Sequence, residues 1–380
     1  MSKSLLERAI ELLSAWSVMV GVPAAALGTI VCCLRPPTSN SRAVLGCRLG
    51  FAAYLAWIIL YDRGTPSRGG WSALIGRKLP IWPALRRYFS AELITEQPLT
   101  PGERYILGIH PHGVLSFGSF SNLVGNPDAF PGLSWRLVTV SSNFLVPVWR
   151  EILLSIGMAD ASESSVHHML ERGISVAIVV GGAAESLETR PGVNDLTLAR
   201  RLGFVRLAIT YGAALVPIFT FGETETFRQV LPNPKSSLVR RAQEAFLSFA
   251  GFTVPSVAGR PSMLGLVPYR TPLLTVVGAP LRVPHDPHPT MRLVIETHER
   301  YCAALNELYV KYAPEAARRG IPTPPLRVRD EPPTPREIAD MGKRLDVKFA
   351  QTQTQTQTQT QTQTQANGYA GGAASLSAAF

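Results

Sequence analysis

Two long apolar stretches stand near the start of the chain. Residues 12–34 carry no charged side chain, and residues 43–61 carry only Arg48. As a helix, the first stretch would be about 35 Å long at ~1.5 Å per residue, enough to cross a hydrocarbon core of about 30 Å. The connection at residues 35–42 contains prolines, which stop a helix. The pattern predicts a membrane-embedded helical hairpin over residues 1–62.

Two other interpretations of the first stretch remain open. Its Ala24-Ala25-Ala26 sequence resembles a signal-peptide cleavage site, although a second apolar stretch and a basic flank follow it. Alternatively, Pro23 kinks the helix so that the hairpin enters the bilayer without crossing it.

The segment that follows the hairpin, residues 63–87, contains basic side chains and no acidic ones. We interpret it as a basic juxtamembrane linker, and its basic residues are Arg63, Arg68, Arg77, Lys78, Arg86 and Arg87. The connection at 35–42 has only two basic residues. The positive-inside bias therefore puts the rest of the chain in the cytosol.

Residues 88–325 alternate between short apolar runs and helical segments. Five runs are expected as strands, at 104–109, 135–141, 174–180, 214–221 and 273–278. Helices are expected at 162–172, at 195–211 with Asp195 as N-cap, and at 291–312. Several strands are apolar on both faces, as in a covered parallel sheet. This predicts an α/β domain with a mainly parallel sheet flanked by helices, with ligands at the carboxyl ends of the strands.

Two further segments are distinguished by composition. Residues 235–252 have a basic face and an apolar face, which fits either a surface helix packed on the core or a helix lying on a membrane. Residues 326–380 are rich in proline and charge, run through a Gln-Thr repeat at 351–365, and end in Gly, Ala and Ser. We expect this tail to be disordered, because it cannot bury a core.

Composition narrows the classes of protein. Of 380 residues only 17 % are charged and the mean hydropathy is +0.12, which excludes a highly charged disordered chain. Four cysteines, three of them in apolar stretches, do not form a disulfide scaffold or a zinc spacing. The net charge of +10 needs an anionic partner: nucleic acid, a membrane surface or a phosphate-bearing small molecule. No aromatic-interleaved basic patch favours nucleic acid.

The strongest candidate for chemistry is a pair of histidines at the end of the first predicted strand. His110 and His112 flank Pro111 and precede Gly113. A neutral imidazole is the best general base at cellular pH, and two at a strand end are hard to explain as packing. A metal site is the alternative, but it needs at least one further ligand and no other histidine has a suitable spacing. We therefore expect no metal.

Two other strand ends carry candidate residues. Gly181-Gly182 follows a strand and brings backbone N–H groups together, with Glu185 and Arg190-Pro191-Gly192 next in the sequence. This combination indicates an anion or oxyanion site, although Gly-Gly alone is common in turns. At Phe221-Gly222-Glu223 the alternatives are a plain turn or a carboxylate that orients an imidazole or an acceptor hydroxyl. The sequence contains no Gly-x-Ser-x-Gly elbow, so a serine hydrolase is disfavoured.

These motifs together resemble the type-2 diacylglycerol acyltransferase family, which includes monoacylglycerol and wax-alcohol acyltransferases. The resemblance covers about residues 75–325, and its motifs occur in the family's order and spacing. They are His110-Pro111-His112-Gly113, Gly181 to Glu185 running into Arg190-Pro191-Gly192, Arg201 to Arg206, and Phe221-Gly222-Glu223.

The resemblance implies an endoplasmic-reticulum membrane enzyme, also found on lipid droplets, that moves a fatty acyl group from acyl-CoA to a lipid hydroxyl without a further cofactor. It also implies kinship with glycerolipid acyltransferases that use a His-x4-Asp pair. The chain departs from that pattern, because Leu115 lies five residues after His110 and Phe117 lies five after His112. An acidic partner must come from elsewhere, and Glu185 and Glu223 are the candidates.

The expected mechanism is direct acyl transfer. One imidazole, with His112 favoured, deprotonates the acceptor hydroxyl, which attacks the thioester. N–H groups near Gly113 or Gly181-Gly182 stabilise the oxyanion, and Arg190, Arg200 and Arg201 are candidate contacts for the CoA phosphates. Diacylglycerol is the expected acceptor, with monoacylglycerol or a wax alcohol as alternatives. A non-catalytic lipid-binding membrane protein is the alternative from another class, and the oligomeric state is left open.

Overall fold

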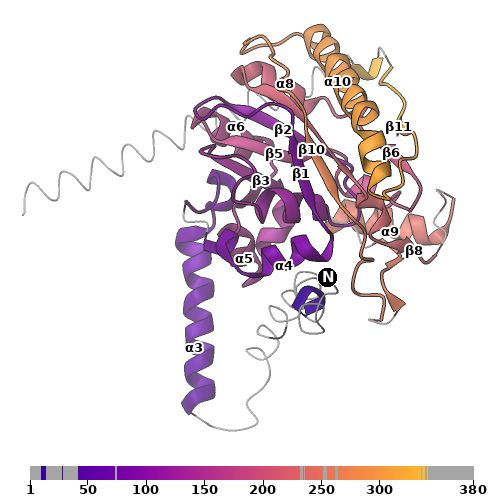
Figure 1. The fold of residues 1–380 in the computed structure, drawn as a ribbon. Helices are drawn as coiled ribbons and strands as arrows, with labels where there is room; N and C mark the ends of the chain where they lie inside the picture. The colour runs from indigo at the N-terminus through magenta and orange to yellow at the C-terminus, as the bar shows by residue number, and fades with distance from the viewer. Residues whose placement is uncertain are drawn as a thin grey trace, which may run out of the picture. The chain divides into compact units, whose positions relative to one another are not determined.

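The computed structural model describes residues 10–13, 28, 42–72, 75–231, 234, 236–250, 255–261, 264–334, 336–338 and 340. Residues 1–331 form one compact unit, and residues 332–380 are counted as a second. All elements described below belong to the first unit (Figure 1).

A seven-stranded sheet forms the centre of this unit. Its order is β1-β10-β7-β2-β5-β3-β4. The strands from β7 to β4 are parallel to one another, while β10 pairs antiparallel with β7 and parallel with β1. The mainly parallel sheet is therefore confirmed. The strands are β1 (Glu92–Thr95), β2 (Tyr105–His110), β3 (Trp135–Thr139), β4 (Met158–Asp160), β5 (Ser175–Val179), β7 (Ala214–Phe221) and β10 (Leu274–Val277).

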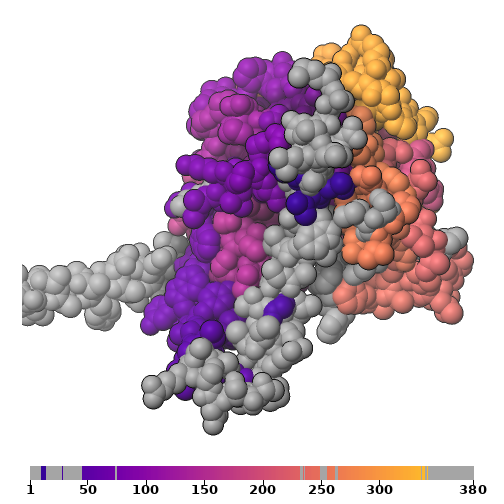
Figure 2. Space-filling view, turned by 60° about the horizontal axis from the view of Figure 1, so that its bottom comes forward, coloured from indigo at the N-terminus to yellow at the C-terminus, as the bar shows by residue number. Residues whose placement is uncertain are grey.

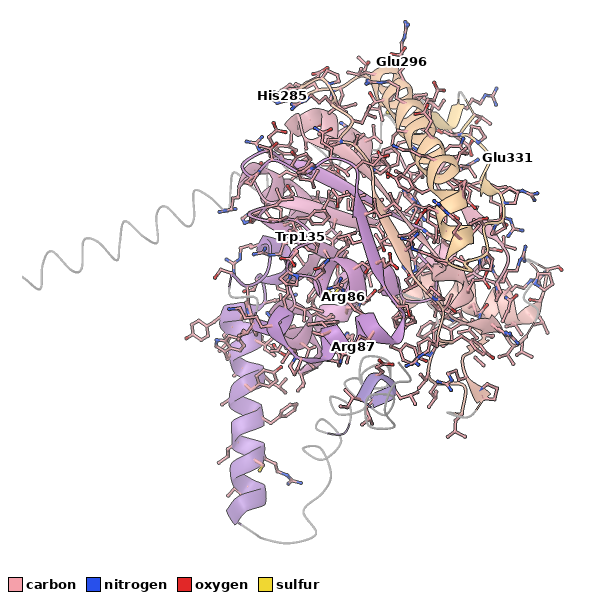
Figure 3. All side chains as sticks on the ribbon, viewed as in Figure 1. Arg86, Arg87, Trp135, His285, Glu296 and Glu331 are labelled. Carbon is pink, nitrogen blue, oxygen red and sulfur yellow. The ribbon has the colours of Figure 1, made fainter. Side chains whose placement is uncertain are left out.

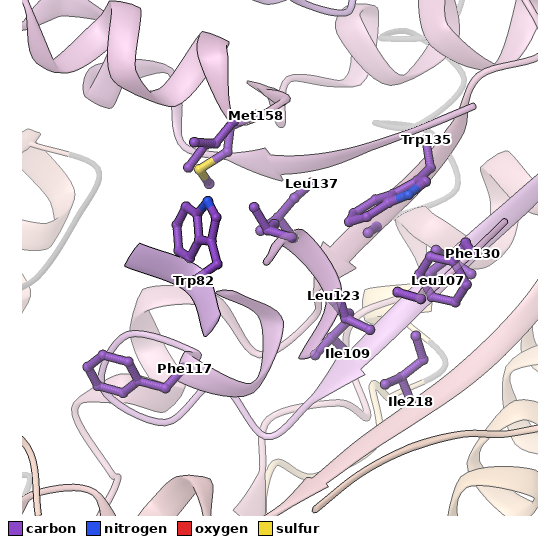
Figure 4. Close-up of a cluster of buried hydrophobic side chains, with 14 of the residues drawn as sticks. Trp82, Leu107, Ile109, Phe117, Leu123, Phe130, Trp135, Leu137, Met158 and Ile218 are labelled. Carbon is purple, nitrogen blue, oxygen red and sulfur yellow. The ribbon is translucent and has the colours of Figure 1, made fainter. Parts of the chain in front are cut away.

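Helices cover both faces of the sheet (Figure 1). One face packs against α6 (Glu163–Glu171), α8 (Gly203–Tyr211) and the long α10 (Met291–Arg318). Alternate residues of β2 point to the other face, where Leu107 and Ile109 join a core that includes Trp82, Phe117 and Leu123 (Figure 4). Because side chains alternate along a strand, Gly108 and His110 point toward α8 and α10.

The remaining elements are short. Further α-helices are α4 (Ile81–Tyr88), α5 (Trp149–Ser155), α7 (Gly182–Ser186) and α9 (Leu238–Ala250), and the last lies within the amphipathic segment 235–252. Single turns of other helix types are η2 (Ile58–Asp62), η3 (Pro66–Arg68), η4 (Ile75–Lys78), η5 (Ser119–Val124), η6 (Ser141–Leu145) and η7 (Glu223–Glu225). Two small sheets pair β8 (Arg228–Gln229) with β9 (Val257–Ala258), and β6 (Asn194–Leu196) with β11 (Leu326–Val328).

The second apolar stretch is helical, as its composition predicts. Helix α3 (Arg42–Trp57) continues into η2, and within the described residues Leu45–Arg68 is the helical stretch long and apolar enough to cross a membrane. Its apolar window is unburied. The hydroxyl of Tyr54 near its end contacts Glu151 and accepts a hydrogen bond from the Val148 N–H at 2.8 Å. The first arm of the predicted hairpin, 12–34, lies almost entirely outside the described residues.

Segment 63–87 packs into the domain instead of forming a separate linker. Trp82 and Leu85 of α4 are core residues. The Arg136 side chain of β3 donates to the carbonyls of Gly69 and Trp71 at 2.8 and 3.1 Å. Residues 10–13 lie beside α4 as well (Figure 2). The buried Glu11 carboxylate forms ion pairs with Arg87 of α4 and with Arg270. Basic side chains here serve packing as well as charge.

The C-terminal boundary of the domain lies further along the chain than residue 325. Strand β11 pairs in parallel with β6, and the Arg329 N–H donates to the Leu196 carbonyl at 2.8 Å. Residues 326–331, which we assigned to the tail, are therefore part of the α/β unit. The same pairing overturns the expectation for 195–211: Asp195 lies in β6, and the helix begins only at Gly203. The Gln-Thr repeat lies outside the described residues.

Candidate active site

The histidine pair lies at the carboxyl end of β2, near the middle of the sheet. His110 is the last residue of the strand and continues its pairing with β7, opposite Phe219. Gly113 then turns the chain with φ of +60°, a conformation that glycine adopts without strain. A Cβ on Gly113 would lie 2.5 Å from Cγ of Glu223, so the loop passes too close to that residue for any side chain. The loop is therefore fitted tightly against β7 and its following turn.

His110 is fully buried and faces α10. Its Nε2 lies 2.9 Å from the hydroxyl of Tyr301, which also donates to the Gly108 carbonyl at 3.2 Å. A hydroxyl has one proton, and a carbonyl can only accept. Tyr301 therefore accepts from Nε2–H of His110, which leaves Nδ1 unprotonated and without a hydrogen-bond partner among the residues that the structure describes. Burial lowers the pKa of His110 to about 3, and the charge of the nearby His298 contributes a smaller part of that shift. This ring is therefore neutral.

His112 is half-buried and is the more accessible of the two rings. Its Nδ1 lies 3.1 Å from the carbonyl of Gly113, an acceptor that requires Nδ1 to carry the proton. The lone pair is consequently on Nε2. Burial lowers the pKa of His112, and the bond to Gly113 partly opposes that shift. A neutral imidazole with a defined tautomer is what a general base requires.

Glu223 anchors the far side of the histidine loop. Its two carboxylate oxygens accept from the N–H groups of Phe117 and Gly118, each at 2.8 Å. Burial raises the pKa of the Glu223 carboxyl to about 7, and the two N–H donors oppose that shift. Among the residues that the structure describes, neither oxygen bonds an imidazole, and Glu223 holds the backbone of the loop. That Glu223 orients an imidazole or an acceptor hydroxyl stays a prediction.

Glu185 anchors the near side of the same loop. Its Oε1 accepts from the N–H of His112 at 2.6 Å, and its Oε2 accepts from the N–H of Thr197 at 2.9 Å. Burial raises the pKa of Glu185 to about 7, opposed by these N–H donors and by Arg201. This carboxyl thus ties the histidine loop to the segment that follows β6.

The Gly181-Gly182 turn lies against Glu185 and not against an imidazole. A Cβ on Gly181 would come 2.0 Å from Oε2 of Glu185, so this approach requires glycine. Gly182 begins α7, the short helix that carries Glu185. Nη2 of Arg201 donates to the Gly181 carbonyl at 3.1 Å, which closes the group.

The other two predicted arginines are exposed and lie apart from this group. Arg190 forms a loose ion pair with Asp195, at 3.9 Å. Arg200 donates from Nε to the Glu331 carbonyl at 3.1 Å, and its backbone N–H donates to Asp330. Their roles as CoA phosphate contacts stay predictions.

Two cavities lie away from the histidine pair, and the described residues contain no metal-type cluster. No group of three or more His, Cys, Asp and Glu side chains suitable for a metal occurs among those residues. Two cavities of about 360 and 310 Å³ share Glu103 and Arg282 in their walls. They lie at the amino ends of β2 and β7, the end of the sheet opposite His112.

Two residues that matter here carried no sequence signal. Tyr301 reaches His110 from a helix 191 residues away, and Asp330 reaches the segment after β6 from the far end of the domain. Neither belongs to a motif. Only the helical periodicity of apolar residues along α10 could have suggested that Tyr301 faces the sheet.

The comparison with known proteins decides the family. The sequence model described as diacylglycerol acyltransferase matches residues 47–321. The chain belongs to the diacylglycerol acyltransferase family. The resemblance seen in its motifs is thereby confirmed, and with it the assignment to an acyltransferase.

Similar proteins are found in fungi and animals. Diacylglycerol O-acyltransferase 2A of Umbelopsis ramanniana is 40% identical over 271 residues, which cover 68% of this chain and 76% of that one. Diacylglycerol O-acyltransferase 2 of Xenopus laevis is 39% identical over 272 residues, covering 69% and 75%. The bovine (Bos taurus) 2-acylglycerol O-acyltransferase 1 is 40% identical over 283 residues, covering 72% and 83%.

Among solved structures, the 1-acyl-sn-glycerophosphate acyltransferase PlsC of Thermotoga maritima is similar at 11% identity. It covers 83% of this chain and 95% of that one, with a TM-score of 0.33. That score is too low to carry an argument, so the fold rests on the strand order given above.

Proposed function

We propose that this protein is a membrane-bound O-acyltransferase that moves a fatty acyl group from acyl-CoA to the free hydroxyl of diacylglycerol, producing triacylglycerol. The family and the names of the relatives support the reaction class. The single observation that carries the mechanism is the tautomer of His112, whose Nδ1–H is held by the Gly113 carbonyl so that Nε2 is free to accept a proton.

The reaction runs in two balanced stages. Nε2 of His112 takes the proton of the acceptor hydroxyl while its oxygen bonds to the thioester carbon, giving a tetrahedral oxyanion. That intermediate then collapses, the C–S bond breaks, and the CoA sulfur leaves with the proton held on the imidazolium. The products are the new ester and CoA-SH, and His112 returns to its neutral form.

Some of the backbone N–H groups near Gly113 are not available for oxyanion stabilisation. The N–H groups of His112, Phe117 and Gly118 already donate to the two buried carboxylates. They are therefore committed to holding the loop. The N–H groups at Gly113 itself and at Gly181-Gly182 are the candidates that remain from the sequence prediction for this edge of the sheet.

Several features support a site that faces a membrane. Gly125, in the turn after η5, lies against Trp82 of α4. Because η5 follows β2 in the chain, this contact puts the carboxyl end of β2 on the side of the unit where α4 lies. Figure 3 shows Arg86 and Arg87 on that side, with His285 and Glu296 on the opposite side. Exposed apolar side chains follow β2 and β3 at this end, at Leu115, Leu145 and Val146. The end of α3 contacts the same region through Tyr54. We propose the endoplasmic reticulum membrane, with the catalytic unit in the cytosol, and lipid droplets as locations.

The bovine relative favours a second acceptor. It is named a 2-acylglycerol O-acyltransferase and is as similar as the diacylglycerol enzymes, so monoacylglycerol is the alternative substrate. The two acceptors are distinguished by expressing the chain in cells that lack triacylglycerol synthesis and supplying labelled acyl-CoA to their microsomes. The labelled neutral lipid that forms identifies the acceptor. Labelled lipid binding without any ester product would instead establish the lipid-binding alternative.

The base assignment is tested in the same microsomes. We expect His112→Ala to lower the rate of ester formation by about 10²–10⁴-fold, the contribution of a general base. The matched variant is His288→Ala, because His288 is an exposed histidine in the loop before α10. If His112→Ala, present at wild-type levels, esterifies at the wild-type rate, His112 is not the base.

A further inference from the structure

The last six residues of the α/β unit hold the segment that follows β6. We use the name C-terminal clasp for residues 326–331. Its strand β11 pairs with β6 in parallel register, from Leu326 opposite Asn194 to Val328 opposite Leu196. The clasp therefore fixes where β6 ends and where the next residues begin.

Asp330, within the clasp, accepts hydrogen bonds from three consecutive backbone N–H groups. Its Oδ1 accepts from Leu198 at 2.8 Å and from Ala199 at 3.0 Å, and its Oδ2 accepts from Arg200 at 2.9 Å. Successive N–H groups that converge in a turn form a concavity suited to an anion. Here the anion is a side chain of the chain itself, and charge-assisted bonds of this kind are the stronger ones.

This turn lies one residue from the active-site network. The N–H of Thr197 donates to Glu185, whose other oxygen accepts from His112. Adjacent N–H groups of one short segment are thus held by two carboxylates, Glu185 on one side and Asp330 on the other. The Leu198 carbonyl is also fixed, by Nε2 of His298 at 3.0 Å.

We infer that Asp330 is a positioning residue for acyl transfer. It holds residues 198–200 and so fixes the adjoining Thr197, which holds Glu185, which holds the backbone of His112. The inference rests on the proposed function for the catalytic role of His112. It assigns a purpose to the first residues of a segment that sequence composition indicates to be a tail. It also gives Arg200 a structural contact with the clasp, since its backbone N–H and its Nε both donate to residues 330–331.

The test compares two variants of the full chain in microsomes. Asp330→Ala empties the N–H concavity, and we expect kcat to fall by about 10- to 100-fold with little change in KM for acyl-CoA, because a displacement near 1 Å at a reacting group costs this much. Added acetate or formate should restore much of the rate by occupying the vacated site. Asp330→Asn fills the same space with an amide, so it should lose activity without being rescued.

A second readout does not depend on turnover. Backbone hydrogen exchange in peptides covering 194–201 and 108–114 should be faster in Asp330→Ala than in the wild type and should slow again with acetate. The exposed Asp340 provides a matched control, and Asp340→Ala should behave as wild type in both assays.

The outcomes separate the two proposals. Wild-type rates in Asp330→Ala, or a loss that neither anion restores, overturn the positioning role. If the wild-type chain forms no ester at all, the proposed function fails, and the exchange data alone decide the link between Asp330 and the histidine loop. Unchanged exchange at 108–114 would break that link.

Discussion

Removal of the Tyr301 hydroxyl tests whether the buried histidine matters to the site. In Tyr301→Phe, Nε2–H of His110 loses its partner at 2.9 Å, and the carbonyl of Gly108 loses its bond at 3.2 Å. Since Nδ1 of His110 has no partner to begin with, the ring would then have none. Leaving one buried donor unsatisfied costs about 1–3 kcal/mol, and the phenylalanine ring creates no cavity.

Two measurements follow from that magnitude. We expect the melting temperature in detergent to fall by about 2–12 °C, at roughly 2–4 °C per kcal/mol for a large domain. We also expect kcat to fall by about tenfold or more, because a His110 ring that can turn no longer fixes the start of the loop that carries His112.

Tyr105→Phe is the matched control for this change. Tyr105 is buried on the same strand but at its amino end, where its hydroxyl accepts from the Thr100 N–H and donates to Glu103, both at 3.0 Å. It should lose similar stability and keep its activity. Two results would show that the His110 contacts do not matter to the site. One is an equal kcat for the two variants, and the other is a wild-type melting temperature for Tyr301→Phe.

Two further predictions concern the loop supports. Because the folded pKa of Glu223 is about 7 and its ordinary value is 4.5, the folded state holds a proton that the unfolded state releases, and this stabilisation is lost as pH rises from about 4.5 through 7. The free energy of unfolding in urea should therefore fall between pH 5 and pH 8 by about 2.5 kcal/mol more in the wild type than in Glu223→Gln. An equal fall in the two proteins would contradict the raised pKa. Gly108→Ala would place Cβ 2.0 Å from the Tyr301 hydroxyl, so we expect losses of thermal stability and activity, whereas Gly203→Ala meets no atom within 4 Å and should be neutral in both assays.

Much of the fold could be predicted from the sequence because its central strands are long and apolar. All five expected strands occur, with ends that differ from the prediction by at most two residues. The strands that the sequence did not predict are short. They lie at the edges of the main sheet or in the two small two-stranded sheets. Three residues, as in β4, β6 or β11, are too few to display a period, and their pairing partners are distant in the sequence.

The incorrect cap at Asp195 has the same origin. An acidic residue before an apolar run is typical of a helix start, but β11 pairs with residues 194–196 and overrides that local preference. The residues of the candidate site were better predicted where they cluster in motifs. His112, Glu185 and Glu223 do come together, whereas contacts from Tyr301 and Asp330 depend on tertiary structure that no local pattern encodes.

The parallel pairing of β11 with β6 also has a bearing on the order of events during synthesis. A ribosome makes the apolar α3 before any strand of the sheet, and it makes Asp330 after all of them. The nascent polypeptide can thus reach the bilayer with its histidine loop still incompletely supported. Acyl transfer would then switch on only once nearly the whole protein has left the ribosome, when the enzyme is already next to its lipid substrates.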